Sequence, residues 1–153
     1  MQQYTLAIIK PDAIKRNLSG KIISKIEENN FRIMAIKMVK LTKKDAQSFY
    51  YVHRERPFYE SLCNFMASTP VVVMVLAKNN AIEDFRTLMG ATNPELADPH
   101  TIRKEYAMSI EQNSIHGSDS LISAKREIAF FFAEYELSHL ELITESDLDA
   151  IVR

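Results

Sequence analysis

The chain carries short apolar runs separated by segments with helical periodicity. Residues 4–10, 32–40 and 70–78 are such runs, and β-branched valines dominate the third. Short apolar runs bounded by polar or chain-breaking residues are typical of buried strands. A shorter strand is expected at residues 114–117, with the sequence SIHG. The pattern therefore predicts a sheet of four strands.

The segments between these runs have the spacing of amphipathic helices. Thr42 and Asp45 are placed as in a capping box at a helix start. Asn80 is expected to cap the helix that Gly90 ends. The strongest helical pattern follows residue 117, and its expected inward face comprises Leu121, Ala124, Ile128, Phe131 and Phe132.

The order of these elements predicts the fold. Without two extra helices and a long loop at residues 90–112, the chain reads β-α-β-β-α-β, which is the ferredoxin-like plan. We therefore expect an α+β fold, with one antiparallel four-stranded sheet and helices packed on one of its faces. Residues 1–153 are expected to form a single domain. Its tail, residues 138–153, is weakly patterned, with one short helix expected over residues 146–152.

The composition is ordinary for a globular protein, with 46% apolar residues, 25% charged residues and a net charge of −1. This charge gives no electrostatic argument for binding nucleic acid or an acidic membrane surface. Cys63 is the only cysteine, which excludes an intrachain disulfide and a cysteine-based zinc site. The sequence does not open with a signal-peptide pattern, and its longest apolar run, residues 70–77, is too short to span a membrane. We therefore expect a cytoplasmic protein.

Several common sites are excluded by residue spacing. Gly20, Gly90 and Gly117 are the only glycines, and they lie too far apart for a glycine-rich phosphate loop or a dinucleotide fingerprint. The histidines are too scattered for a helical metal-binding pair, and no G-x-S-x-G elbow is present. Any bound phosphate must therefore be held by side chains.

The local sequence leaves the role of His116 open. A lone histidine in a short apolar strand is by default a hydrogen-bonded core residue. Against this, Gly117 would leave one side of the ring open, and Glu127 would lean back toward the ring from the following helix. Glu127 would then bond one ring nitrogen and leave the other as a nucleophile, and the helix start near Ser118 would favour an anion. These features alone do not decide between a nucleophile and a core residue.

Three cations give a second indication. Lys10 ends the first predicted strand, Arg86 precedes the loop at residues 90–112, and Arg103 lies within that loop. Each alone is expected to be a solvated surface charge. Two arginines that flank one loop, however, can clamp a polyphosphate.

Five segments of the chain resemble the nucleoside diphosphate kinase family. In order they are IIKPDAIKR, HRERPFY, RTLMGATNP, TIRKEY and NSIHGSDS, and the last contains the signature N-x-x-H-G-S-D. They follow the order and spacing of the family over about residues 4–137. Several motifs in register are far more specific than any single one. The tail after Leu137 does not match the family.

The resemblance implies transfer of the γ-phosphoryl group from a nucleoside triphosphate, typically ATP, to a nucleoside diphosphate through a phosphohistidine. The cycle would be ping-pong, with broad tolerance of base and sugar. His116 would be the nucleophile, with Glu127 orienting it and Ser118 supporting that pair. By motif position, Lys10, Tyr50, Arg86, Thr92, Arg103 and Asn113 would hold the phosphates and ribose, while Phe58, Leu62 and Ile110 would hold the base.

A metal and an assembly are also implied by the resemblance. Mg²⁺ would arrive on the nucleotide phosphates, with Asp119 as an outer-sphere partner. Members of the family form hexamers or tetramers, and a homo-hexamer is favoured here because of the long loop at residues 90–112. His116 must be neutral to attack, so phosphorylation should slow as acid protonates the ring. Position 100 is often glycine in the family, and His100 is interpreted as a tolerated surface substitution.

Two other functions would use the same histidine or fold. A non-catalytic nucleotide-binding regulatory module would be expected to have lost some catalytic motifs, which are complete here. A histidine phosphocarrier that passes phosphate to a protein would need neither the aromatic slot nor the arginines around the loop.

Overall fold

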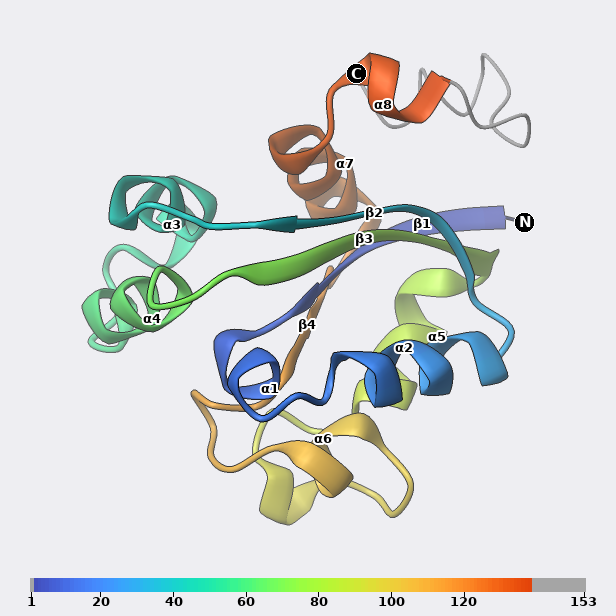
Figure 1. Ribbon diagram of the computed structural model, residues 1–153, viewed down its shortest axis with the longest axis horizontal. Helices are drawn as coiled ribbons and strands as arrows, with labels where there is room; N and C mark the ends of the chain where they lie inside the picture. The colour runs from blue at the N-terminus through green and yellow to red at the C-terminus, as the bar shows by residue number, and fades with distance from the viewer. Residues whose placement is uncertain (1, 139–153) are drawn as a thin grey trace.

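The computed structural model describes residues 2–138, and its centre is one antiparallel sheet (Figure 1). The sheet has the order β2-β3-β1-β4, from β1 (Gln2–Ile9), β2 (Arg32–Val39), β3 (Val71–Asn79) and β4 (Ile115–Gly117). All neighbouring strands pair antiparallel. The predicted ferredoxin-like α+β fold is therefore confirmed, and the strands lie close to their expected bounds.

Helices cover both faces of this sheet, so the expected packing on one face is wrong (Figure 1). Alternate residues of a strand point to opposite faces. Leu6 and Ile8 of β1 accordingly belong to one buried cluster, and Ala7 and Ile9 to another. The first cluster includes residues of α3 (Lys43–Phe49), α4 (Tyr59–Met66), α7 (Leu121–Phe131) and α8 (Glu134–Ser138). The second includes residues of α1 (Pro11–Lys15), α2 (Ser19–Glu28), α5 (Ala81–Met89) and α6 (Ile102–Tyr106).

The predicted helix caps differ in outcome. Thr42 Oγ1 accepts from Asp45 N at 3.0 Å and Asp45 Oδ2 accepts from Thr42 N at 2.8 Å, so the capping box of α3 is present. Asn80 precedes α5 at φ 58, but its side chain donates to Asp84 Oδ1 and does not cap the helix. Gly90 ends α5 at φ 84, as expected.

The inward face of α7 is shorter than predicted. Ala124, Ile128 and Phe131 are buried, as is Phe132, whereas Leu121 is 55% exposed. Leu121 is the first residue of α7. Because helical side chains lean toward the helix N-terminus, a first residue projects past the core instead of into it.

The loop at residues 90–112 contains more structure than its sequence indicates. It holds the 3-10 helix η2 (Pro94–Leu96) and α6, and Thr101 Oγ1 caps α6 by accepting from Lys104 N at 3.2 Å. The short helix expected over residues 146–152 lies outside the described residues. Among residues 2–138, none of the helices has the length and apolar character needed to cross a membrane.

Candidate active site

His116 lies on β4, opposite Ile8 of the central strand β1. The neighbouring Ile115 is fully buried in the second cluster, so His116 points to the other face, where its side chain is 20% exposed. Gly117 was expected to leave one side of the His116 ring open, but the structure gives it a different role. A Cβ there would lie 2.7 Å from Phe85 and Met89 of α5, so the glycine lets α5 approach β4 instead of opening the histidine ring.

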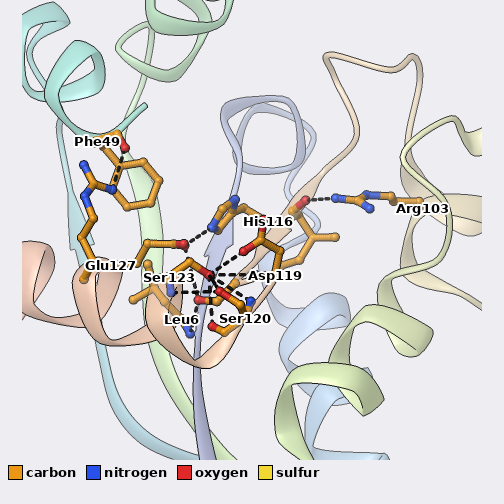
Figure 2. Close-up of polar contacts among 11 residues, drawn as sticks. Leu6, Phe49, Arg103, His116, Asp119, Ser120, Ser123 and Glu127 are labelled. Atoms are coloured by element: carbon orange, nitrogen blue, oxygen red, sulfur yellow. Dashed lines mark hydrogen bonds and ion pairs between the residues drawn. The ribbon is translucent and has the colours of Figure 1, made fainter. Parts of the chain in front are cut away.

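Glu127 reaches the imidazole from α7, as Figure 2 shows. His116 Nε2 donates to Glu127 Oε1, and Ser118 Oγ donates to the same oxygen at 3.3 Å. Ser118 Oγ in turn accepts from the backbone N of Leu6 at 3.1 Å. Within residues 2–138, Nδ1 of His116 has no hydrogen-bond partner. The contact thus fixes the ring through Nε2 and leaves the Nδ1 lone pair available.

Two aromatic rings from the C-terminal end of α3 form a wall beside His116. The Phe49 ring meets the imidazole edge-on at 5.5 Å between centroids, and the Tyr50 ring does so at 6.3 Å. Tyr50 is buried, and its hydroxyl has no partner within the described part of the chain. Burial, followed by the nearby Glu127, raises the pKa of Tyr50, so the phenol keeps its proton and can donate it to a ligand.

Sequence reasoning missed His53, which η1 (Tyr51–His53) places next to this wall. Its ring is stacked on Tyr50 at 6.3 Å and tilted against Phe58 at 5.6 Å. The only sequence signal was its helical spacing from Phe49 and Tyr50, which indicated a shared face but no contact with the site.

Lys10 lies at the N-terminal boundary of α1 and is only 7% exposed, so the expectation of a solvated surface charge is wrong for it. Its backbone N donates to Ser114 O at 2.9 Å. Its ammonium has no hydrogen-bond or ion-pair partner within residues 2–138. Burial, and then the nearby Arg103, lowers the pKa of Lys10 to about 8, so the amine remains mostly charged at neutral pH. Asp12 and Glu111 attract the ammonium and offset part of this lowering, and the charge that remains can bind an anion.

Arg103 is buried and held toward β4 by two backbone carbonyls. It donates to Gly90 O and to Ile115 O, each at 2.9 Å, and its Nε has no partner in the described chain. Burial, and then Arg86, lowers the pKa of Arg103 to about 10, which still leaves it charged. Arg86, Thr92, Arg103 and Gly117 line one pocket of about 430 Å³.

Asn113 and Asp119 lie on either side of His116 in sequence. Asn113 is buried, its Nδ2 donates to Thr92 O at 3.5 Å, and its Oδ1 has no partner among residues 2–138. Asp119 Oδ1 accepts from Ser123 Oγ at 2.6 Å, and this bond, with Arg86 among the further causes, lowers the pKa of Asp119. The carboxylate is therefore ionised. In the described residues no group of three metal-ligating side chains occurs, so a metal here would need ligands from a bound molecule.

The three residues expected at the base are not equally available. Phe58 and Ile110 are exposed, at 46% and 60%. Ser61 Oγ donates to Glu111 Oε1 at 3.1 Å, which joins α4 to the segment that carries Ile110. Leu62, by contrast, is 8% exposed and belongs to the first cluster.

The sequence model of the family described as nucleoside diphosphate kinase matches residues 3–137. The chain belongs to this family. A nucleoside diphosphate kinase of Trichlorobacter lovleyi is 59% identical over 135 residues, which is 88% of this chain and 98% of that protein. The one of Geobacter sulfurreducens is 56% identical over the same shares. The fold agrees with a crystal structure of the Aquifex aeolicus nucleoside diphosphate kinase, with a TM-score of 0.88 and 42% identity over 90% of this chain and 99% of that one.

Family membership confirms the predicted activity at the level of the reaction. The chain is a nucleoside diphosphate kinase, an enzyme that transfers phosphoryl groups between nucleotides. It binds nucleotides as substrates, and this function is favoured over the regulatory-module and phosphocarrier alternatives. The family match ends at residue 137, so the segment after it is additional to the matched domain.

Proposed function

We propose that His116 is the phosphorylated residue and that Nδ1 is the attacking atom. The observation that carries this proposal is the contact between Glu127 Oε1 and Nε2 of the ring, which leaves Nδ1 without a partner in the described chain. The Glu127 carboxylate then keeps the ring proton on Nε2, so that Nδ1 is the unprotonated nitrogen that can act as nucleophile.

The proposed step balances without a separate base. The Nδ1 lone pair attacks the γ-phosphorus, the Nδ1–P bond forms, and the P–O bond to the leaving nucleoside diphosphate breaks with its electrons on oxygen. The proton on Nε2 stays in its bond to Glu127, whose charge offsets the positive charge that the ring acquires. A second nucleoside diphosphate then takes the phosphoryl group by the reverse step, which gives a ping-pong cycle.

Charge neutralisation is assigned to the two arginines that line the pocket and to Lys10, which lies near Arg103. Phosphoryl transfer depends mainly on positioning and electrostatic stabilisation. Lys10, Arg86 and Arg103 supply the positive charge, and Ser118 supports Glu127. The buried polar atoms that lack partners in the described chain, on Tyr50, Arg103 and Asn113, are ones a nucleotide would satisfy, together with Lys10 and Thr92.

The base would stack on the exposed Phe58, with Ile110 and Leu62 as the other expected contacts. Stacking is tolerant because each base has a π-face. This supports the predicted tolerance of different bases, with ATP as the usual donor.

Mg²⁺ is the metal we expect to accompany the nucleotide. When bound, it neutralises charge on the phosphate oxygens. The ionised Asp119 fits an outer-sphere role, because it offers one carboxylate near Arg86 and not a complete set of ligands.

We also propose that residues 1–153 form a single domain, that the chain assembles as a homo-hexamer, and that it is located in the cytoplasm. The loop at residues 90–112 supports the hexamer because it exposes Leu96 and Met108, which are large apolar side chains. A single, buried cysteine is compatible with a reducing compartment. Mass measurement in solution would test the hexamer against a tetramer.

Labelling with γ-labelled ATP tests the histidine assignment. We expect an acid-labile, alkali-stable label that is discharged onto added GDP and is lost in His116→Ala. His100→Ala, which removes an exposed histidine, should label normally. Label retained in His116→Ala would overturn the assignment, and label discharged only onto another protein would favour the phosphocarrier.

A further inference from the structure

The surroundings of His116 come from two helices that are far apart in sequence. Glu127 on α7 holds Nε2, while Phe49 and Tyr50 at the end of α3 form the aromatic wall. Figure 2 shows Glu127 and Phe49 on the same side of His116, with Arg103 on the other side. The orientation of the ring therefore depends on how α3 and α7 are held relative to each other.

Arg126, the residue before Glu127, joins these two helices. Its Nη1 donates to Phe49 O at 3.0 Å and its Nη2 donates to Ser48 O at 2.8 Å. The last carbonyls of a helix lack amide partners within that helix, and a cation there is favoured by the helix dipole. The guanidinium carbon also lies 5.9 Å from the centroid of the Phe49 ring. Arg126 thus ties the backbone and the ring of Phe49 to α7.

A planar guanidinium suits this position better than an ammonium would. It presents parallel donors to adjacent acceptors, whereas lysine offers one flexible point charge. The two carbonyls belong to consecutive residues at the end of α3, immediately before Tyr50. One turn of α7 therefore contributes two neighbouring residues with different contacts: Arg126 to the aromatic wall and Glu127 to the imidazole.

We propose that Arg126 is a positioning residue for phosphoryl transfer, which fixes Phe49 and Tyr50 against His116 without touching the substrate. This inference rests on His116 being the phosphorylated residue. Loss of the two hydrogen bonds frees the end of α3, so the imidazole loses its edge-on support and Nδ1 is less often aimed at the phosphorus. A displacement of this kind acts on the chemical step more than on nucleotide affinity.

Single-turnover phosphorylation at saturating γ-labelled ATP, with the KM for ATP, tests the proposal. Arg126→Met keeps the length of the side chain and removes both donors. We expect its phosphorylation rate to fall about tenfold, with a smaller change in KM. Arg126→Lys should recover part of the rate. The matched control is Lys125→Met, which removes an exposed cation from the next position of α7 and should stay within about twofold of the wild type.

The assay also separates a positioning role from a purely structural one. Each variant is measured at a temperature at which its circular dichroism and melting curve show it folded. If folded Arg126→Met has the wild-type rate and KM, or if Lys125→Met loses as much rate, the proposal is wrong. Failure of the histidine assignment would look different, because the wild type itself would then carry its label on a residue other than His116.

Discussion

On one side of His116 the polar groups are paired, apart from the buried hydroxyl of Tyr50, whereas on the other side several polar atoms have no partner within residues 2–138. The paired side runs from Leu6 N through Ser118 to Glu127 and the ring. The unpaired side comprises Arg103 and Asn113, with a free Nε and a free Oδ1, and Lys10, which is 7% exposed and whose ammonium no described residue bonds directly.

The two sides affect the stability of the folded chain in opposite directions. Paired buried groups stabilise the folded chain, while buried groups without partners reduce its stability until a ligand supplies their bonds. The paired side therefore aims the nucleophile before substrate arrives. On the unpaired side, binding of a ligand with anionic oxygens for Lys10 and Arg103 and a hydroxyl donor for Asn113 would remove this cost. Variants on the two sides should accordingly differ in the relation between activity and stability.

Glu127→Gln should have the largest effect on activity. The amide cannot offset the charge of the phosphorylated ring and can present the wrong donor to Nε2. We expect kcat to fall about a hundredfold or more, as for other losses of a histidine-orienting carboxylate. Steady-state kinetics measure the effect, and Glu27→Gln, an exposed carboxylate on α2, is the control. A kcat within twofold of the wild type would remove Glu127 from the mechanism.

Lys10→Met should separate activity from stability on the unpaired side. Removing the cation should raise the KM for nucleotides about tenfold, since a charge-assisted contact to phosphate is lost. The nucleotide-free protein should become more stable, because the cost of burying this charge exceeds its attraction to Asp12 and Glu111, and an apolar chain of similar length carries no such cost. Urea unfolding without nucleotide measures the gain. A less stable Lys10→Met would contradict the proposed cost.

The same lysine predicts a pH dependence of stability. Burial lowers its pKa to about 8 in the folded chain, against about 10.4 in the unfolded chain. Between these values the unfolded state binds more protons, so the free energy of unfolding rises with pH. The wild type should gain stability relative to Lys10→Met from about pH 8 to about pH 10, with a constant difference below that window. Parallel curves across the window would show that Lys10 is not perturbed.

Ser118→Ala should act on the paired side with the opposite sign. It leaves the buried Leu6 N without its acceptor, which costs about 1–3 kcal/mol of stability. Glu127 keeps its contact to the ring, so kcat should fall less than in Glu127→Gln. Urea unfolding and kcat together check this, with Ser24→Ala on the exposed face of α2 as control. A more stable Ser118→Ala would erase the contrast between the two sides.

The strands and the contact between Glu127 and His116 could be predicted from local sequence because each depends on spacing. β3 is a valine-rich run, and Glu127 lies far enough along α7 to lean back to His116. The packing of helices on both faces of the sheet could also have been predicted from the sequence. β3 is apolar at nearly every position instead of alternating, which is typical of a strand buried on both sides.

Features that depend on contacts between distant segments could not be read from the sequence. The purpose of Gly117 follows from the approach of α5, which no local pattern reveals. The partnership of Arg126 with Phe49 and Ser48 joins residues that are 77 and 78 positions apart. Leu62 was assigned to the base slot by motif position, yet its burial depends on how α4 packs on the sheet.

Of these substitutions, His100→Gly should change stability and activity least, so it serves as a reference for the others. His100 is exposed and has φ 68, a left-handed backbone that favours glycine. The substitution removes this strain but gives the unfolded chain more freedom, so the net gain should be below about 1 kcal/mol. His100→Ala, which keeps a Cβ at the same backbone angle, should show no gain. Because His100 contacts neither side of His116, kcat and KM should stay unchanged in both variants. A change in kcat with His100→Gly would mean that the backbone of the loop at residues 90–112 is coupled to the unpaired side. The stability change of Lys10→Met would then include a contribution from this loop.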